Sequence, residues 1–207
     1  MKTPTSKSNF NPEEFKNLAM YLKENKDNIH NPNEISIECI NRVIAGRLYY
    51  SAFLILRETI IRELSNYSNC PKEVNYFKDA LLGGSVHNTL LKFIEKIRDN
   101  NNLNQNPELR EAISQIYNSL DCLKGHRVAA DYDLSIPTPV KIKTNSNHKT
   151  VKTNRDYEEI NFEKTRVIKK LERKYNLIIE SLSKLEGILR KNKNDVCKIL
   201  RELWVKK

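Results

Sequence analysis

Apolar side chains recur every three or four residues along most of this chain, which is the spacing of amphipathic helices. The pattern is longest over residues 32–64, where it includes Ile40, Ile44, Leu48, Ala52, Ile55 and Thr59. Alternation of single apolar and polar residues, which is typical of half-buried strands, is nearly absent. We therefore predict an all-α protein, a bundle of four or five main helices in which residues 32–64 form the central helix.

Three Asn-Pro pairs mark predicted helix starts, because Asn is a good N-cap and Pro is well tolerated at the first helical position. They are Asn11-Pro12, Asn31-Pro32 and Asn106-Pro107. The first two caps are followed by Glu at the third position, as in a capping box. We expect helices over residues 12–26 and 32–64, and from residue 107 onward.

The remaining segments follow from breaks in the pattern. Gly83-Gly84 separates a short predicted helix at residues 72–82 from a helix capped by Ser85, and the Asn-rich residues 99–106 are a predicted loop. Residues 136–156 are rich in Pro, Thr, Asn and Lys, and we interpret them as a basic flexible insertion or a short hairpin. Helices are again expected over residues 157–191 and 194–205. The chain thus divides into an N-terminal helix (1–30), a helical core (31–135), the insertion (136–156) and C-terminal basic helices that complete the bundle (157–207).

Size and composition fit one soluble domain. The chain has 207 residues, of which 39% are hydrophobic and 30% charged. Its apolar runs fall short of the roughly 18 residues that a membrane span needs, and residues 1–9 are polar, unlike a secretion signal. We expect a cytoplasmic protein that does not engage a membrane.

Motifs for metal, cofactor or small-molecule chemistry are lacking in the sequence. The cysteines Cys39, Cys70, Cys122 and Cys197 form no Cys-x-x-Cys pair and have no His at metal-ligand spacing. Gly-rich phosphate loops and nucleophile motifs are missing as well. We expect reduced thiols rather than disulfides, no metal, and no cofactor.

The positive charge is concentrated at the C-terminal end. Residues 1–140 carry 17 Lys and Arg against 17 Asp and Glu, whereas residues 141–207 carry 19 against 9, which is the whole net charge of +10. Such a surplus favours a polyanionic partner such as RNA, although a solvated helix surface gives the same pattern. The candidate RNA-binding residues are Lys141, Lys143, Lys149, Lys152, Arg155, Lys169, Lys170 and Arg173.

The best candidate site lies near the end of the helix that starts at residue 107. Arg127 and Asp131 are four residues apart and share a helix face, and Tyr132 follows directly. A guanidinium fork beside such groups suits a phosphate, because it can donate two parallel hydrogen bonds. The simpler alternative is a structural Arg–Asp ion pair, which is common at this spacing and contributes only about 0.3 to 0.5 kcal/mol.

These residues also carry a resemblance to a known family. The segment Arg127-Val128-Ala129-Ala130-Asp131-Tyr132 resembles the Arg-x-x-Ala-Asp-Tyr element of one branch of the HEPN superfamily, which includes toxin–antitoxin and defence-associated proteins. Leu48-Tyr49-Tyr50-Ser51-Ala52-Phe53 resembles the Tyr-Tyr-x-x-Phe pattern of that family's long helix, and His87 resembles the His that opens its next helix. The resemblance covers residues 35–135 and 157–190.

The resemblance implies a homodimer whose paired helices bring two Arg-containing motifs to one cleft. In the nuclease members, Arg is followed after four to six residues by His, and RNA is cut without metal. This chain departs from that pattern, since Tyr132 stands where some toxins carry the His, and a phenol is a poor general base at neutral pH. His87 is the preferred substitute acid or base and His126 the second choice, although lone histidines are more often capping or surface groups.

Two functions of different classes remain open from the sequence. In the first, the protein is RNA-directed, as a metal-independent endoribonuclease or an RNA binder in a toxin, CRISPR-associated or other antiviral defence system. Arg127, Tyr132, Asp131, His126 and His87 are then the candidate catalytic residues. In the second, Arg127, Asp131 and Tyr132 form a structural network at a dimer or partner interface, with an antitoxin or a defence complex as the protein partner. Tyr49, Tyr50 and Phe53 are expected to be core residues rather than a base-stacking platform.

Overall fold

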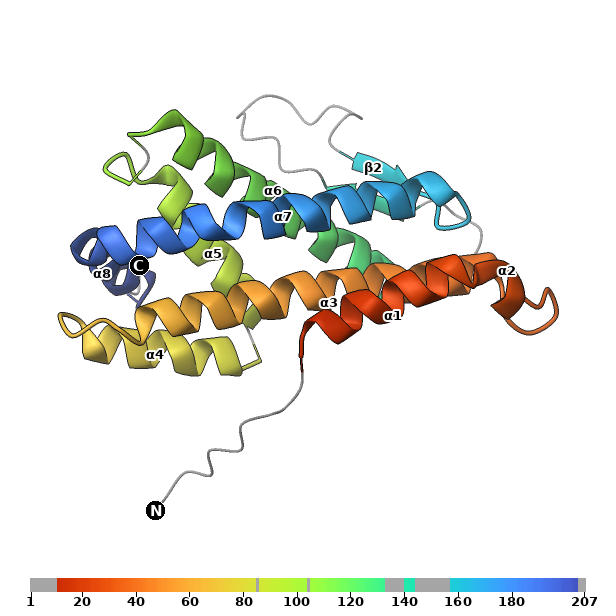
Figure 1. Ribbon diagram of the computed structural model, residues 1–207, viewed down its shortest axis with the longest axis horizontal. Coiled ribbons are helices and arrows are strands. Elements are labelled where there is room, and N and C mark those ends of the chain that lie inside the picture. Colours follow the sequence, from red (N-terminus) through yellow and green to blue (C-terminus); the bar gives the residue numbers. More distant parts are fainter. Residues whose placement is uncertain (1–10, 85, 104, 133–139, 144–156, 205–207) are drawn as a thin grey trace, which may run out of the picture.

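The computed structural model describes residues 11–84, 86–103, 105–132, 140–143 and 157–204, and for 132, 140–143, 157–159 and 204 it describes the backbone alone. It confirms an all-α bundle (Figure 1). The helices are α1 (Glu13–Glu24), α2 (Lys26–Ile29), α3 (Ile37–Leu64), α4 (Pro71–Leu82), α5 (Val86–Asp99), α6 (Pro107–Tyr132), α7 (Thr165–Lys191) and α8 (Lys193–Trp204).

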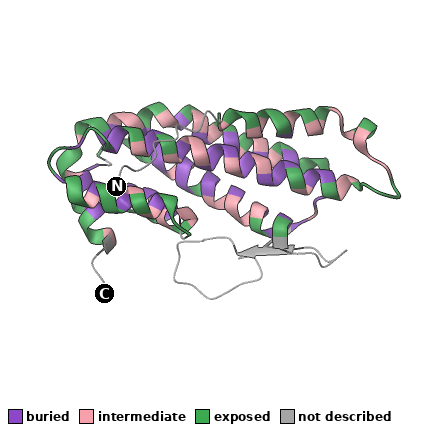
Figure 2. Ribbon diagram, turned by 90° about the horizontal axis from the view of Figure 1, so that it is seen from below, coloured by how far each residue is buried: buried purple, intermediate pink, exposed green. Residues whose placement is uncertain are grey.

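Helix α3 is the centre of the bundle, as its apolar pattern predicts. It packs against α1, α6 and α7, and α6 and α7 also pack on each other. Figure 2 shows buried residues along the inward sides of these long helices. By length and composition alone α3 is apolar enough to cross a membrane, but more than half of its most apolar stretch is buried inside the bundle. It is therefore the core helix of a bundle that is compatible with a soluble protein.

Two of the three predicted Asn-Pro helix starts agree with the structure. The side chains of Asn11 and Asn106 accept hydrogen bonds from the backbone N–H groups of Glu13 and Glu108, at 3.0 and 2.8 Å. Ser85, which is predicted to cap the helix after Gly83-Gly84, lies outside the described residues.

The predicted start of α3 is wrong. Asn31 does not cap a helix but closes a turn, in which its backbone pairs with Ile35 and its side chain donates to Glu34 at 3.0 Å. The helix begins after Ser36, whose hydroxyl accepts from the N–H of Cys39 at 3.1 Å. Asn-Pro followed by Glu is compatible with a tight turn as well as with a capping box, and local sequence alone does not separate the two.

The start of α7 also differs from the prediction. Residues 157–160 are not helical but form β2 (Tyr157–Ile160), which pairs antiparallel with β1 (Val140–Lys143), with Val140 opposite Ile160. Only β1 lies within the expected insertion at residues 136–156, its partner β2 follows it, and residues 144–156 lie outside the described part of the chain. Helix α7 then packs against α3 and α6, so the C-terminal section shares the core of the preceding helices.

Two of the four cysteines form a disulfide, contrary to the expectation of reduced thiols. Cys70, at the N-terminus of α4, is bonded to Cys197 of α8, with the two Cα atoms 5.9 Å apart. The pair is separated by 127 positions in the sequence, so only the packing of α8 on α4 brings the thiols together. Cys39 and Cys122 are thiols outside this disulfide, and the Cys122 sulfur lies 3.6 Å from Nδ1 of His126.

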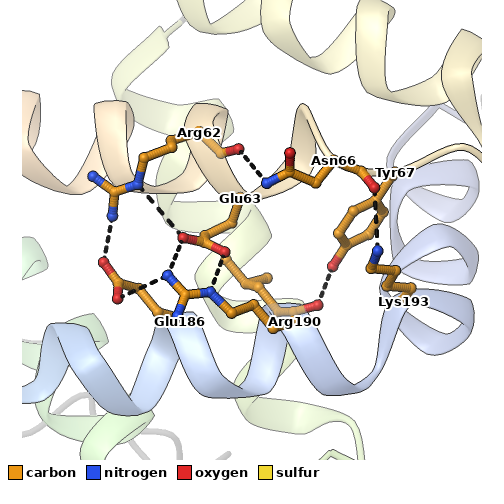
Figure 3. A network of polar contacts seen from close by, with 8 residues as sticks. Arg62, Glu63, Asn66, Tyr67, Glu186, Arg190 and Lys193 are labelled. Carbon is orange, nitrogen blue, oxygen red and sulfur yellow. Dashed lines mark hydrogen bonds and ion pairs between the residues drawn. The ribbon is translucent and has the colours of Figure 1, made fainter.

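A network of charged side chains joins the C-terminal ends of α3 and α7 (Figure 3). Glu63 is 3% exposed, and its two oxygens accept hydrogen bonds from Nε and Nη2 of Arg190, both at 2.7 Å. Arg62 pairs with Glu63 and with Glu186. We call these four residues the Glu63 clasp. Beside it, the Tyr67 hydroxyl donates to the carbonyl of Leu189 at 2.5 Å.

Candidate functional site

Arg127 lies in the last turns of α6, and the structure brings two partners to its guanidinium. Its Nε pairs with Asp131 Oδ2 at 2.7 Å, as expected for residues four apart on one helix. Its Nη2 donates to the hydroxyl of Tyr50 on α3 at 2.6 Å, and the guanidinium carbon lies 5.3 Å from the centre of the Tyr50 ring. The candidate arginine is thus held between α3 and α6.

His87, in the first turn of α5, is part of the same cluster. Its Nδ1 lies 2.6 Å from the hydroxyl of Tyr49, and its ring is 4.5 Å from that of Phe53 and 6.2 Å from that of Tyr50, centre to centre. The Tyr-Tyr-x-x-Phe segment of α3 therefore surrounds His87 on one side and holds Arg127 on the other. Together we call Tyr49, Tyr50, His87, Arg127 and Asp131 the Arg127 cluster.

The tyrosines of the cluster, and Phe53 next to it, pack in or against the core. Tyr49 is 1% and Phe53 3% exposed, as predicted for core residues, whereas Tyr50 is half-buried. Tyr50 also meets Phe15 of α1, with ring centres 6.0 Å apart. The cluster is consequently anchored on the central helix of the bundle.

Within the cluster the charge of Arg127 is matched by Asp131, Lys124 is a further cation nearby, and His87 is kept neutral. Burial lowers the pKa of His87, and the nearby cations Arg127 and Lys124 lower it further. Burial raises the pKa of Tyr49 well above its ordinary value near 10. At neutral pH both groups of the Tyr49–His87 hydrogen bond are therefore uncharged.

The end of α6 is fixed by an arginine from α3. Arg42 donates through Nη1 to the carbonyls of Ala129 and Ala130, at 2.9 and 3.2 Å, and pairs with Glu38 at 2.6 Å. The last carbonyls of a helix lack intrahelical partners, so this contact stabilises the helix end that carries Arg127 and Asp131. Arg42 has no sequence signal for this capping role, because the contact depends on the crossing of α3 and α6.

The other predicted catalytic residues are placed less favourably. His126 is 2% exposed, and its Nδ1 donates to the carbonyl of Cys122 at 2.8 Å, as expected of a histidine within the core. Tyr132 is the last residue of α6, and its side chain lies outside the described part of the structure. Of the two histidine candidates, the fold brings His87 to Arg127 and buries His126.

Three of the predicted RNA-binding residues lie on α7. Lys169 and Arg173 are exposed on the first half of α7, and Lys170 lies between them. Helix α7 packs on the side of α3 that carries Ser51, whose hydroxyl lies 3.3 Å from that of Tyr175. Neighbouring positions of a helix are turned by about 100°, so Tyr50 directs the Arg127 cluster to a different side of α3.

The remaining predicted RNA-binding residues have no described side chains. Lys141 and Lys143 lie on β1, of which the backbone alone is described. Lys149, Lys152 and Arg155 lie outside the described residues. Within the described residues, no group of three or more His, Cys, Asp and Glu side chains is arranged to hold a metal ion.

Comparison with known proteins found one relative that matches along nearly its whole length. The uncharacterized protein MJ0628 of Methanocaldococcus jannaschii is 30% identical over 194 residues, which cover 94% of this chain and 98% of the relative. The chain belongs to the family of this archaeal protein. No family model and no solved structure matches it. Because the relative's name gives no activity, the proposal below rests on the residues of the site.

Proposed function

We propose that this protein is an RNA-directed member of the HEPN superfamily, and that the Arg127 cluster contacts the RNA phosphate backbone. The observation that carries the proposal is the convergence of Arg127, His87 and Tyr50 from three separate helices. Each of the three motif segments lies within a single helix, so their presence in the sequence does not require that the polar groups of the three helices meet. Their meeting beside a second cation, Lys124, favours an anionic ligand.

The chemistry suits a phosphate better than a carbonyl or a metal ion. Arginine offers planar paired donors to phosphate oxygens, and its contact with the Tyr50 hydroxyl and with Asp131 limits its rotation before a ligand arrives. If the RNA is cut, Arg127 stabilises the charge that develops on the phosphate, and the candidates for proton transfer are Tyr132 and one of the two histidines, His87 or His126. We further propose a cytoplasmic homodimer that acts in a defence or toxin–antitoxin system.

The test is incubation of the purified protein with labelled total RNA in EDTA, with Arg127→Ala alongside. The matched control is Arg110→Ala, because Arg110 is an exposed arginine near the opposite end of the same helix. We expect RNA cleavage, or a salt-dependent gel shift, that is lost in Arg127→Ala and kept in Arg110→Ala. An RNA that is neither cut nor shifted by the wild-type protein would contradict the proposal.

The basic residues of α7 are proposed to add sequence-independent affinity. We expect the double variant Lys169→Ala with Arg173→Ala to weaken RNA binding and to flatten its dependence on salt, because fewer counterions are released. The control double variant, Lys184→Ala with Lys191→Ala, removes two exposed charges from the second half of α7. Equal effects of the two double variants would show that binding depends on net charge alone.

A second candidate function is a non-catalytic interaction module. It is favoured by the contacts of Arg127 with Asp131 and Tyr50 within the chain. It is also favoured by two exposed apolar residues, Val128 beside Arg127 and Val43 on α3, which are 42% and 40% exposed. In this case Arg127→Ala should change the oligomeric state or the thermal stability and leave RNA untouched. Sedimentation of the wild-type protein and of both variants distinguishes this function from the first.

A further inference from the structure

The hydrogen bond between Tyr49 and His87 joins a buried side chain to a half-buried one. Tyr49 is 1% exposed, and among the described residues its hydroxyl has one hydrogen-bond partner, Nδ1 of His87 at 2.6 Å. His87 itself is only half-buried. A fully buried phenol therefore holds one nitrogen of a ring that remains accessible to solvent.

We propose that Tyr49 is a positioning residue that donates its proton to Nδ1 of His87, and thereby fixes His87 as the Nε2–H tautomer that hydrogen-bonds a phosphate oxygen. The inference deepens the proposed function and rests on it in taking RNA as the source of that phosphate. It assigns to His87 the role of a donor to the ligand, and to Tyr49 no contact with the ligand.

The direction of the hydrogen bond follows from the number of protons. A neutral imidazole has one N–H, and a neutral phenol has one O–H. If Nδ1 of His87 carried the proton, the Tyr49 O–H would need another acceptor, and none is found among the described residues. Because leaving a buried donor without an acceptor is costly, the phenol donates, and the imidazole proton lies on Nε2.

The charged groups around the pair oppose its ionisation. Arg127 and Lys124 of α6 are the cations that disfavour an imidazolium, and burial disfavours a phenolate. Asp131 is already paired with Arg127 at 2.7 Å. Proton transfer from Tyr49 to His87 would create a buried charge pair, so the neutral hydrogen bond is the resting state.

The tautomer decides which ligands the site accepts. An Nε2–H group beside a guanidinium presents two kinds of donor, which suits an anion with several acceptor oxygens such as a phosphate diester. In this state the only unprotonated nitrogen of His87 is Nδ1, and its lone pair already accepts the hydrogen bond from Tyr49. His87 is consequently not a general base in the resting site, and any base for RNA cleavage has to be another group.

The first test is ¹⁵N NMR of the histidine ring nitrogens in the wild-type protein at pH 7.5, with His87→Gln used for assignment. We expect a protonated Nε2 and an unprotonated Nδ1 for His87. In Tyr49→Phe the ring should change to a mixture of the two tautomers, whereas Tyr76→Phe, which alters an exposed tyrosine on α4, should leave it unchanged. A protonated Nδ1 in the wild-type protein overturns the proposal without the need for any variant.

The second test uses inorganic phosphate as the probe. We expect the Nε2 resonance of His87 to shift as phosphate binds, with about tenfold weaker affinity in His87→Ala, the equivalent of one hydrogen bond. His87→Gln keeps an N–H donor near the position of Nε2 and should restore most of the affinity. Equal affinities of the wild-type protein and His87→Ala would overturn the assignment of His87 as a ligand donor.

The outcomes separate this inference from the proposed function. If phosphate shifts His87 in the expected tautomer and RNA is neither cut nor bound, the inference holds and RNA is the wrong source of the phosphate. If RNA binding depends on Arg127 but His87 carries its proton on Nδ1, the proposed function holds and the role of Tyr49 is wrong.

Discussion

Two clusters that contain arginine lie along α3, the Glu63 clasp and the Arg127 cluster, and they differ in how their charges are balanced. In the Glu63 clasp, Glu63 is buried and both of its oxygens are bound by Arg190, with Arg62 and Glu186 completing an alternation of opposite charges. In the Arg127 cluster, Asp131 is partly exposed, the other partner of the cation is the hydroxyl of half-buried Tyr50, and the Tyr49–His87 hydrogen bond lies next to this pair.

The difference distinguishes a structural contact from the binding site that we propose. A carboxylate that is enclosed by guanidinium groups leaves little positive potential for a ligand, and its role is to join α3 to α7. Arg127 has an exposed carboxylate, Asp131, as its acidic partner and Lys124 as a second cation nearby, and we propose that this balance leaves a positive potential for an anionic ligand. The same residue type thus stabilises one end of α3 and forms a candidate site in its middle.

The largest expected effect concerns the disulfide, which lies at the same end of the molecule as the Glu63 clasp. Reduction, or the change Cys70→Ser, should lower the free energy of unfolding by about 4 kcal/mol, because the Cys70–Cys197 bond closes a long loop in the unfolded chain. Urea unfolding with and without reductant measures this, and Cys39→Ser, at an exposed free thiol, is the control. RNA binding by the Arg127 cluster should persist in the reduced protein, provided that it is folded.

Next in size, Arg190→Met should destabilise the protein more than Glu63→Gln does. Removal of the arginine leaves a buried carboxylate with only the longer contact to Arg62, at 3.5 Å. Removal of the carboxylate leaves an arginine that can turn to solvent. Urea midpoints of the two variants test the order, with Lys191→Met as the control for the loss of an exposed charge on α7. Equal midpoints would mean that Glu63 is not effectively buried.

Glu63→Gln should lower the free energy of unfolding by about 2 kcal/mol at pH 7, the contribution of hydrogen bonds to a charged group. Hydrogen bonds from Arg190 hold the pKa of Glu63 below its ordinary value. A lowered folded-state pKa gives stability that is complete above the unfolded-state pKa of about 4.3 and is lost as the pH falls through the folded-state pKa. The difference between wild type and variant should therefore shrink below about pH 4. A difference that is constant with pH would contradict this assignment.

The smallest expected change in stability is that of Arg127→Ala, about 1 kcal/mol, since Asp131 can turn to water and Tyr50 loses one hydrogen bond. The same variant should raise the pKa of His87, because a cation that disfavours the imidazolium is removed. An NMR titration measures the shift, and Arg110→Ala should leave it unchanged. A loss of stability as large as that of Arg190→Met would place Arg127 among the structural contacts.

Most helices could be predicted from the sequence because their signals are local. The period of apolar residues located α3, and the side chains of Asn11 and Asn106 cap helices as predicted. The two boundary errors have a common cause. At Asn31 and at residue 157, local residues fit both a helix and an alternative, and tertiary contacts decide, such as the hydrogen bond from buried Asn41 to the carbonyl of Phe162 just before α7.

The candidate site could be predicted only in part. Arg127 and Asp131 were found because residues four apart meet on any helix, whatever the rest of the fold. The pairing of Tyr49 with His87 and of Tyr50 with Arg127 was not predicted, since these residues are 38 and 77 positions apart.

The sequence by itself determined the all-α class, the central helix and the local Arg–Asp pair, because each depends on the spacing of residues within one helix. The tertiary structure alone decided that Cys70 meets Cys197 and that Arg190 binds Glu63. It also decided that the side chain of His87, rather than that of His126, lies near the guanidinium of Arg127. Helix packing sets these contacts, because the face that each helix buries determines which distant side chains meet.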